Sequence, residues 1–263
     1  MPSNVAVSAV VAGQVRVGAG DDDVWLRKLD AASGDEVWTE TFSGAGAGGF
    51  STDDGGPVAI AADGSIHVLA RIYESFDVQR AMLLRYGPDG GLPQWTYQPV
   101  IAGSEQSFTL GPLTVGADGL PVMAVLRGGG VSVDFWIYKL DANGEELWSR
   151  QRSDFEIRGL GTDWVVEGLA AGGDELLVQG RYLDDQELPG SAWWEIWLAR
   201  LSADGSPRCQ VQQQAEYEGL LPPSLLGYGI AGAVAGSRDG SAVVTGEQVS
   251  DDEAALWLGS FRD

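Results

Sequence analysis

The sequence predicts an all-β protein, a β-propeller of five four-stranded antiparallel blade repeats in which the last blade lacks its outer strand. Three observations predict it: a hairpin that recurs at nearly even steps, a second hairpin before each copy, and no long stretch of helical period. Repeats of four short strands are typical of propeller blades. We therefore expect a single domain over 1–263, with blades at about 5–43, 49–100, 107–154, 163–212 and 228–263.

The recurring hairpin begins with a large apolar residue, at steps of 57, 54, 61 and 60 residues along the chain. These starting positions are Trp25, Met82, Trp136, Trp197 and Trp257. In the first three copies the hairpin closes at another tryptophan: Trp38, Trp95 and Trp148. We interpret the tryptophans as structural residues that pack between neighbouring blades, because each can bury on the order of 200 Å².

The second hairpin consists of small apolar residues and precedes each copy of the first. Its turn is Asp63-Gly64, Asp118-Gly119 or Asp239-Gly240 in three copies. Asp-Gly between alternating apolar residues is a strong hairpin signal, because glycine accepts the positive φ that such turns need. In the first repeat we expect the same hairpin within Val5–Gly20.

The charge excludes several classes of partner. The chain has 38 acidic and 16 basic residues, a net charge of −22, which would repel nucleic acids and anionic membrane surfaces. No apolar run reaches the ~20 residues of a membrane span. One cysteine, Cys209, and one histidine, His67, exclude an internal disulfide and a thiolate zinc cluster. The remaining partners are proteins, glycans and cations.

The whole chain resembles bacterial extracytoplasmic propellers built from delta-sixty-like repeats. The resemblance rests on an apolar strand, Asp-Gly, a second apolar strand and then W-x-x-[KR]-[LY]-D-x-x-G-x-x-x-W, as in "WIYKLDANGEELW". It implies a periplasmic, cell-surface or secreted protein, often a lipoprotein, and no particular activity. The N-terminal residues lack the basic region of a signal peptide.

A local segment, "LDAASGDEVW", is similar to the tryptophan-docking segment of pyrroloquinoline quinone (PQQ) propellers. In that family Asp, Gly and Trp at this spacing lock one blade to the next, and Asp30, Gly34 and Trp38 fit the pattern. Quinoprotein dehydrogenases need eight blades and a calcium-containing cofactor pocket, which five repeats do not supply. The likeness therefore concerns packing, and we predict no resident cofactor, with calcium as a weaker alternative.

One face of the predicted propeller carries acidic connections between the second and third strand of each repeat. We interpret 20–23, 73–79, 128–134, 183–195 and 250–254 as long, variable loops, where binding sites usually lie. Calcium takes six to eight oxygen ligands, yet no D-x-[DN]-x-[DN]-G loop is present. A calcium site and a solvated acidic rim both remain open. The metal candidates are Asp21, Asp22, Asp23, Asp184, Asp185, Asp251 and Asp252.

Aromatic residues on the same loops are candidates for a binding face. Aromatic faces beside carboxylates are used to bind glycans and quaternary amines. The binding-face candidates are Trp193, Trp194, Glu195, Tyr73 and Phe76.

Catalysis has no sequence signal. His67 lies within a strand as an outward- or channel-facing residue, and no serine has a nucleophile-elbow context. We therefore predict no catalytic residue. The function predicted is a non-catalytic binding or scaffold module that presents an acidic face to a protein, glycan or cationic partner, as a monomer or part of a larger ring. The alternative is a calcium-dependent hydrolase of the lactonase or glycosidase kind.

Overall fold

The computed structural model describes residues 8–44, 51–75, 78–100, 108–129, 132–155, 164–188, 191–213, 231–236, 242–249 and 254–261. The chain divides into two compact units, Met1–Leu113 and Thr114–Asp263, and each is described by itself. No helix in the described ranges has the length and hydrophobicity needed to cross a membrane.

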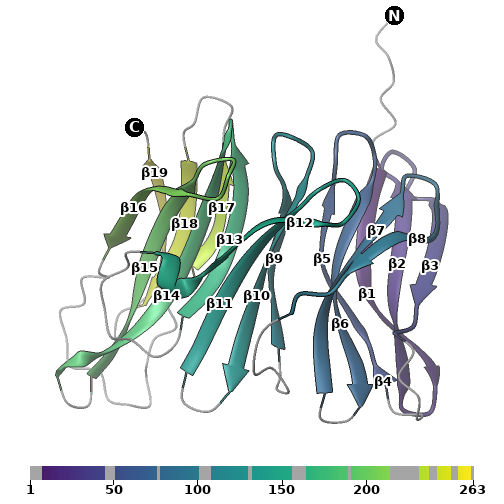
Figure 1. The fold of residues 1–263 in the computed structure, drawn as a ribbon, viewed down its shortest axis with the longest axis horizontal. Coiled ribbons are helices and arrows are strands. Elements are labelled where there is room, and N and C mark those ends of the chain that lie inside the picture. The colour runs from purple at the N-terminus through teal and green to yellow at the C-terminus, as the bar shows by residue number, and fades with distance from the viewer. Residues whose placement is uncertain are drawn as a thin grey trace, which may run out of the picture. The chain divides into compact units, whose positions relative to one another are not determined.

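The first unit holds two sheets, coloured purple to blue in Figure 1. In one sheet β1, β2 and β3 run antiparallel, and the short β4 pairs with β2 in parallel. The other sheet has the order β5-β6-β7-β8. The bounds are β1 (Ser8–Gly18), β2 (Asp21–Asp30), β3 (Glu36–Phe42), β4 (Ser51–Thr52), β5 (Asp54–Ile60), β6 (Ile66–Ser75), β7 (Val78–Gly87) and β8 (Gly90–Tyr97).

The second unit holds two four-stranded sheets, β12-β11-β10-β9 and β13-β14-β15-β16, and a three-stranded sheet, β17-β18-β19. Strand β9 spans the boundary between the units. The bounds are β9 (Phe108–Val115), β10 (Pro121–Gly129), β11 (Ser132–Leu140), β12 (Glu146–Gln151), the 3-10 helix η1 (Arg152–Asp154), β13 (Trp164–Gly172), β14 (Glu175–Leu188), β15 (Ser191–Leu201), β16 (Pro207–Gln213), β17 (Ala231–Gly236), β18 (Ala242–Val249) and β19 (Ala254–Phe261).

The predicted all-β class is confirmed, and four-stranded antiparallel sheets form as predicted in the second, third and fourth repeats. The first repeat differs. Strand β1 is one continuous strand paired with β2 from Ser8 to Gly18, not the hairpin expected within Val5–Gly20. Its middle reads Ala12-Gly13-Gln14, which lacks the Asp-Gly turn signal, so nothing in the sequence reverses the chain there.

The connections between second and third strands are also different from the prediction. They are tight hairpins rather than long loops: β6 reaches Ser75 and β7 begins at Val78, while β14 reaches Leu188 and β15 begins at Ser191. Leu183 and Asp184 pair in register with Trp194 and Trp193, inside the predicted loop 183–195. Extended pairing satisfies backbone N–H and C=O groups even where the side chains are acidic.

Each unit has a core between facing sheets, made by alternate residues of the strands. In the first unit Val24 and Leu26 of β2 pack with Val68 and Ala70 of β6. In the second unit Phe135 stacks on Trp197 at a centroid distance of 5.3 Å, and Trp197 is 1% exposed. The remaining residues of this core are Phe155, directly after η1, and residues of β10, β11, β13, β14 and β15.

Two of the closing tryptophans dock onto the turn of the next sheet. Trp38 Nε1 donates a hydrogen bond to Pro88 O at 3.2 Å, and Trp148 Nε1 donates to Ala203 O at 2.9 Å. Each ring lies against a glycine with positive φ, Gly90 or Gly205, where a Cβ would come within 3.0 Å or 2.6 Å of the ring. The turn therefore requires glycine both for its φ and for its contact with the tryptophan.

His67 is buried, contrary to the outward- or channel-facing position predicted for it. It is 1% exposed, and its ring centroid lies 5.8 Å from that of Trp95. Burial lowers the pKa of His67 from 6.5 to about 4, assisted by the positive charge of Arg85 and opposed by Asp63. The imidazole is therefore neutral in the folded protein at neutral pH.

Protonation of the unfolded state is expected to destabilise the fold at mildly acidic pH. Because the pKa of His67 is lower in the folded protein, stability falls as the pH drops below 6.5, by about 2 kcal/mol between pH 6.5 and 5. Urea unfolding at these two pH values measures the loss. The variant His67→Gln should show little change across this interval, and an equal loss in the variant would contradict the account.

Candidate functional site

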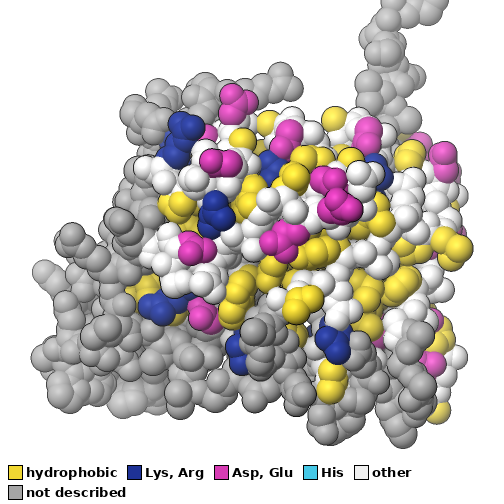
Figure 2. Space-filling view, viewed as in Figure 1, with side chains coloured by type: hydrophobic (Ala, Val, Ile, Leu, Met, Phe, Trp, Pro, Cys, Tyr) yellow, Lys and Arg dark blue, Asp and Glu magenta, His cyan; other side chains and the backbone are white. Residues whose placement is uncertain are grey.

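The predicted acidic rim does not form a metal centre in the described part of the chain. Asp21, Asp22 and Asp23 lie at the start of β2, and Arg16 Nε lies 2.9 Å from Asp22 Oδ1. That hydrogen bond lowers the pKa of Asp22. Among the described residues, no group of three or more His, Cys, Asp or Glu side chains could hold a metal ion. On the face shown in Figure 2, acidic side chains are spread out beside hydrophobic ones.

The other metal candidates fall outside what the structure describes. Asp184 and Asp185 lie in β14, but their side chains are not described, and Asp251 and Asp252 are outside the described residues. The calcium prediction therefore stays open for these four residues, and the described carboxylates do not fit it.

A buried carboxylate that sequence reasoning missed lies beside Asp21 and Asp23. Asp53 is 0% exposed and accepts hydrogen bonds from Gly44 N at 2.8 Å and Tyr73 N at 2.9 Å. Burial raises the pKa of Asp53, and the negative charges of Asp23 and Asp21 add to the effect. Its two carboxylate oxygens accept hydrogen bonds from two separate backbone segments of the first unit. Asp53 therefore has a structural role, because it holds these segments together. Its segment, "STDDGG", gave no sequence signal of this role.

The aromatic binding-face candidates are not brought together as a described surface. Tyr73 lies in β6, with the Arg71 guanidinium 5.7 Å from its ring centroid. Trp193, Trp194 and Glu195 lie in strand β15 rather than on a loop, and their side chains are not described. Phe76 is outside the described residues.

The remaining structural tryptophans lie within strands. Trp25 is partly buried under the Arg27 guanidinium, 4.8 Å from its ring centroid. Trp136 is partly buried in β11. The side chain of Trp257, in β19, is not described.

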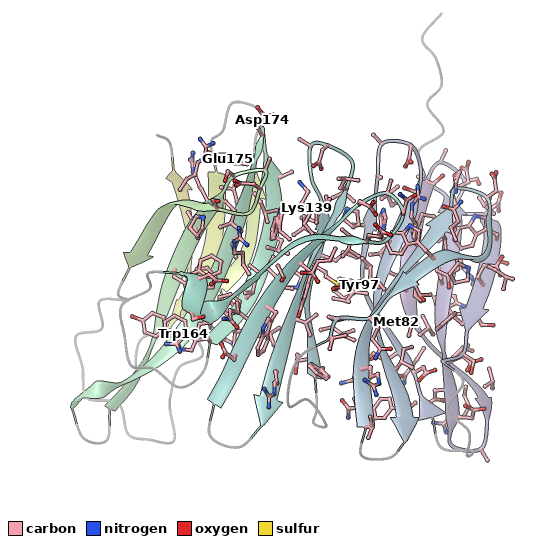
Figure 3. The ribbon with its side chains drawn as sticks, in the orientation of Figure 1. Met82, Tyr97, Lys139, Trp164, Asp174 and Glu175 are labelled. Atoms are coloured by element: carbon pink, nitrogen blue, oxygen red, sulfur yellow. The ribbon has the colours of Figure 1, made fainter. Side chains whose placement is uncertain are left out.

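The second unit contains a pocket that the sequence did not predict. It lies where the β9–β10 and β13–β14 turns meet the neighbouring β15–β16 turn, and its volume is about 370 Å³. Figure 3 shows Asp174 and Glu175 at one end of the β13–β14 hairpin and Lys139 on β11. The lining residues that carry polar or aromatic groups are Asp118, Lys139, Trp148, Asp174, Glu175 and Ser202.

Charged side chains on two adjacent sheets face this pocket. Lys139 Nζ lies 2.5 Å from Asp118 Oδ2, and the Lys139 side chain is only 8% exposed. On the neighbouring sheet, Arg200 Nη1 lies 3.5 Å from Glu175 Oε2, and Arg208 Nε lies 3.9 Å from the other carboxylate oxygen. One wall thus carries the Lys139–Asp118 ion pair, and the other carries the Glu175 carboxylate with its two arginine partners.

The rim of the pocket is stiffened by the β15–β16 turn. Ser202 Oγ donates to Asp204 Oδ1 at 2.5 Å, and Ser206 N donates to the same oxygen at 3.0 Å. These hydrogen bonds lower the pKa of Asp204 to about 2. The guanidinium of Arg150 donates to Gly205 O at 2.8 Å and fixes the turn to β12.

The lysine at one repeat position has different partners in the two units. Lys28 holds the repeat position of Lys139, but its Nζ crosses to the next sheet and donates to Pro88 O at 2.7 Å. Lys139 instead turns to Asp118 of its own sheet. A related pair, Arg85 and Asp63, lies 3.4 Å apart in the first unit. The ion pair is therefore a feature of both units.

Comparison with known proteins gives the fold and no family. No protein-family model matches the sequence, and no curated protein matches it. Among solved structures, an ulvan lyase of polysaccharide lyase family PL25 has a TM-score of 0.52 at 12% identity, over 95% of this chain and 61% of that one. An endo-arabinase from Bacteroides thetaiotaomicron has a TM-score of 0.44 at 12% identity, over 97% and 90% of the two chains.

A quinohemoprotein alcohol dehydrogenase from Pseudomonas putida is similar as well, with a TM-score of 0.44 at 13% identity, over 95% of this chain and 40% of that one. The chain therefore spans well under two thirds of the dehydrogenase and 61% of the ulvan lyase. These structures are β-propellers. The chain is propeller-like.

The prediction of a non-catalytic binding or scaffold module is wrong by this comparison. The propeller-like structures that resemble the chain are mostly enzymes that act on glycans, and the two with TM-scores of 0.51 and 0.52 are both structures of ulvan lyase. At 12% identity the likeness itself shows the fold.

Proposed function

We propose that this chain is a glycan-active enzyme that hydrolyses glycosidic bonds at the pocket of the second unit. The observation that carries the proposal is that one pocket of about 370 Å³ is lined by the carboxylates Asp118 and Glu175 and by the ammonium of Lys139, which is ion-paired with Asp118. Small-molecule sites typically occupy 300–1,000 Å³. The ulvan lyase structures, which have a similar fold, add support.

Hydrolysis needs one group that accepts a proton and one that donates a proton. In the proposed step a carboxylate, Asp118 or Glu175, takes a proton from water as the water oxygen bonds to the anomeric carbon. The bond from that carbon to the leaving sugar oxygen breaks, and this oxygen takes a proton from Lys139. The carboxylic acid and the amine then return to their starting states by exchange with solvent.

The blade number, the type of repeat, the partner and the location of the chain are part of the same proposal. We propose a five-bladed arrangement from delta-sixty-like repeats, with a glycan as partner and an extracytoplasmic location, where polymeric glycans are met. The described carboxylates of the acidic rim do not fit a calcium site, so no step depends on calcium. Four further carboxylates could still bind calcium, so the test compares activity with and without calcium. They are Asp184, Asp185, Asp251 and Asp252.

The test is a turnover assay on neutral and uronate-containing polysaccharides, with calcium and with a chelator. We expect new reducing ends that carry one oxygen from labelled water for each bond broken, since hydrolysis adds water across the bond. An unsaturated product that absorbs in the ultraviolet would show elimination instead and contradict hydrolysis. No product from any glycan would overturn the proposed function.

A further inference from the structure

We infer that the pocket selects a neutral sugar residue, which it holds by two adjacent hydroxyl groups, and rejects uronic acids. This inference rests on the proposed function and names its substrate class. It is carried by the pairing of charges in the pocket, by the unused hydrogen-bonding capacity of one ion pair, and by the contacts of Trp148.

The cations at the pocket are already engaged by carboxylates. Lys139 is paired with Asp118 at 2.5 Å, and Arg200 and Arg208 both lie within 3.9 Å of Glu175. Asp174 adds an exposed carboxylate to the lining. Arg200 and Arg208 do not line the pocket, so three lining carboxylates stand against one lining ammonium, and a uronate carboxylate entering the pocket would meet like charges. Recognition of a sugar carboxylate usually needs a cation free to form a bidentate pair.

The Lys139–Asp118 pair matches the hydroxyl groups of a vicinal diol. An ammonium has three donors, of which the pair with Asp118 uses one. A carboxylate has about four acceptor positions; Asp118 also accepts from Leu120 N at 3.1 Å. A donor and an acceptor held 2.5 Å apart can engage two neighbouring hydroxyls, one accepting from Lys139 and the other donating to Asp118. An apolar ligand would leave the remaining donors of Lys139 and the remaining acceptor positions of Asp118 without hydrogen bonds.

Trp148 is not available as a stacking platform for a sugar ring. A Cβ on Gly205 would lie 2.6 Å from its ring, so the turn covers one face. The Arg150 guanidinium also lies 5.7 Å from the ring centroid. Binding must therefore come from hydrogen bonds to hydroxyl groups, which favours a sugar residue with several free hydroxyls.

The net charge of −22 acts in the same direction at long range, by repelling polyanionic glycans. Salt screens this effect, with a Debye length of about 10 Å at 0.1 M and ~3 Å at 1 M. The local arrangement at the pocket is screened much less. Comparing binding at low and high ionic strength therefore separates the long-range effect of the net charge from the local effect of the charges in the pocket.

The test is calorimetric titration of the full chain with arabinotetraose, xylotetraose, mannotetraose and tetragalacturonate, at low and high salt. We expect at least one neutral tetrasaccharide to bind, and tetragalacturonate to bind at least tenfold more weakly at both salt concentrations. Lys139→Gln should weaken neutral binding at least tenfold. The matched control Lys28→Gln, at the same repeat position, should change it less than twofold.

Equal or tighter binding of tetragalacturonate, or equal binding once salt is added, would overturn the inference and leave the proposed function standing. Neutral binding unchanged by Lys139→Gln would also overturn it. Absence of binding and of turnover with every saccharide would remove the proposed function itself. The comparison of neutral and uronate ligands uses the wild-type chain, so it holds even where the Lys139 variant fails to fold.

Discussion

Replacing Trp148 by alanine is expected to lower the free energy of unfolding by about 3 kcal/mol. The substitution removes a ring that packs on the core of the second unit and on Gly205, and it removes the hydrogen bond to Ala203 O. Arg150 loses the aromatic face 5.7 Å from its guanidinium. Urea unfolding followed by far-ultraviolet circular dichroism measures the change.

Two variants test the cause of this loss. Trp148→Phe keeps an aromatic ring and loses the hydrogen bond, so it should cost about 1 kcal/mol. Trp38→Ala removes the equivalent docking contact in the first unit, at Gly90 and Pro88, and should cost about as much as Trp148→Ala. Trp38→Ala should leave saccharide binding unchanged. A loss below 1 kcal/mol for Trp148→Ala would contradict the docking role.

Replacing Asp118 by asparagine, or Glu175 by glutamine, is expected to lower glycan turnover at least ~100-fold, because proton transfer by a positioned group contributes 10²–10⁴-fold. Both substitutions keep the shape of the side chain and remove a proton acceptor from the pocket. Initial rates of reducing-end release, measured with saturating glycan, give the change.

Asp63→Asn is the matched control for Asp118→Asn. Asp63 occupies the same turn position in the first unit and pairs with Arg85 at 3.4 Å. A purely structural role of the pair would affect stability in both variants and turnover in neither. If Asp63→Asn lowers turnover as much as Asp118→Asn does, the activity does not depend on the pocket. Thermal melts of both variants separate unfolding from loss of chemistry.

The strands of the middle repeats could be predicted because their turns are marked locally. Gly64 and Gly119 both have the positive φ that the Asp-Gly signal predicts. The strands of the first repeat could not be predicted, since a strand of small apolar residues such as β1 has the same composition as a small apolar hairpin. The extension of β14 to Leu188 could not be predicted, because acidic side chains are typical of loops, whereas backbone pairing does not depend on them.

The pocket could not be predicted, because it depends on the direction of a side chain. Lys28 and Lys139 occupy the same repeat position, yet one crosses to the next sheet and the other pairs within its own. Glu175 begins a strand one residue after Asp174, at a turn that departs from the Asp-Gly pattern. The role of Asp53 could not be predicted either, because its hydrogen-bond partners are backbone groups distant in sequence.

The most direct test of the central claim is a crystal structure of the Glu175→Gln variant soaked with the neutral oligosaccharide that the wild-type chain cleaves. The account predicts a sugar residue in the pocket of the second unit, with hydroxyl groups within hydrogen-bond distance of Lys139 Nζ and Asp118 Oδ2 and the scissile bond beside position 175. A sugar bound elsewhere, for example beside Asp21 to Asp23 at the start of β2, with the pocket empty, would contradict it.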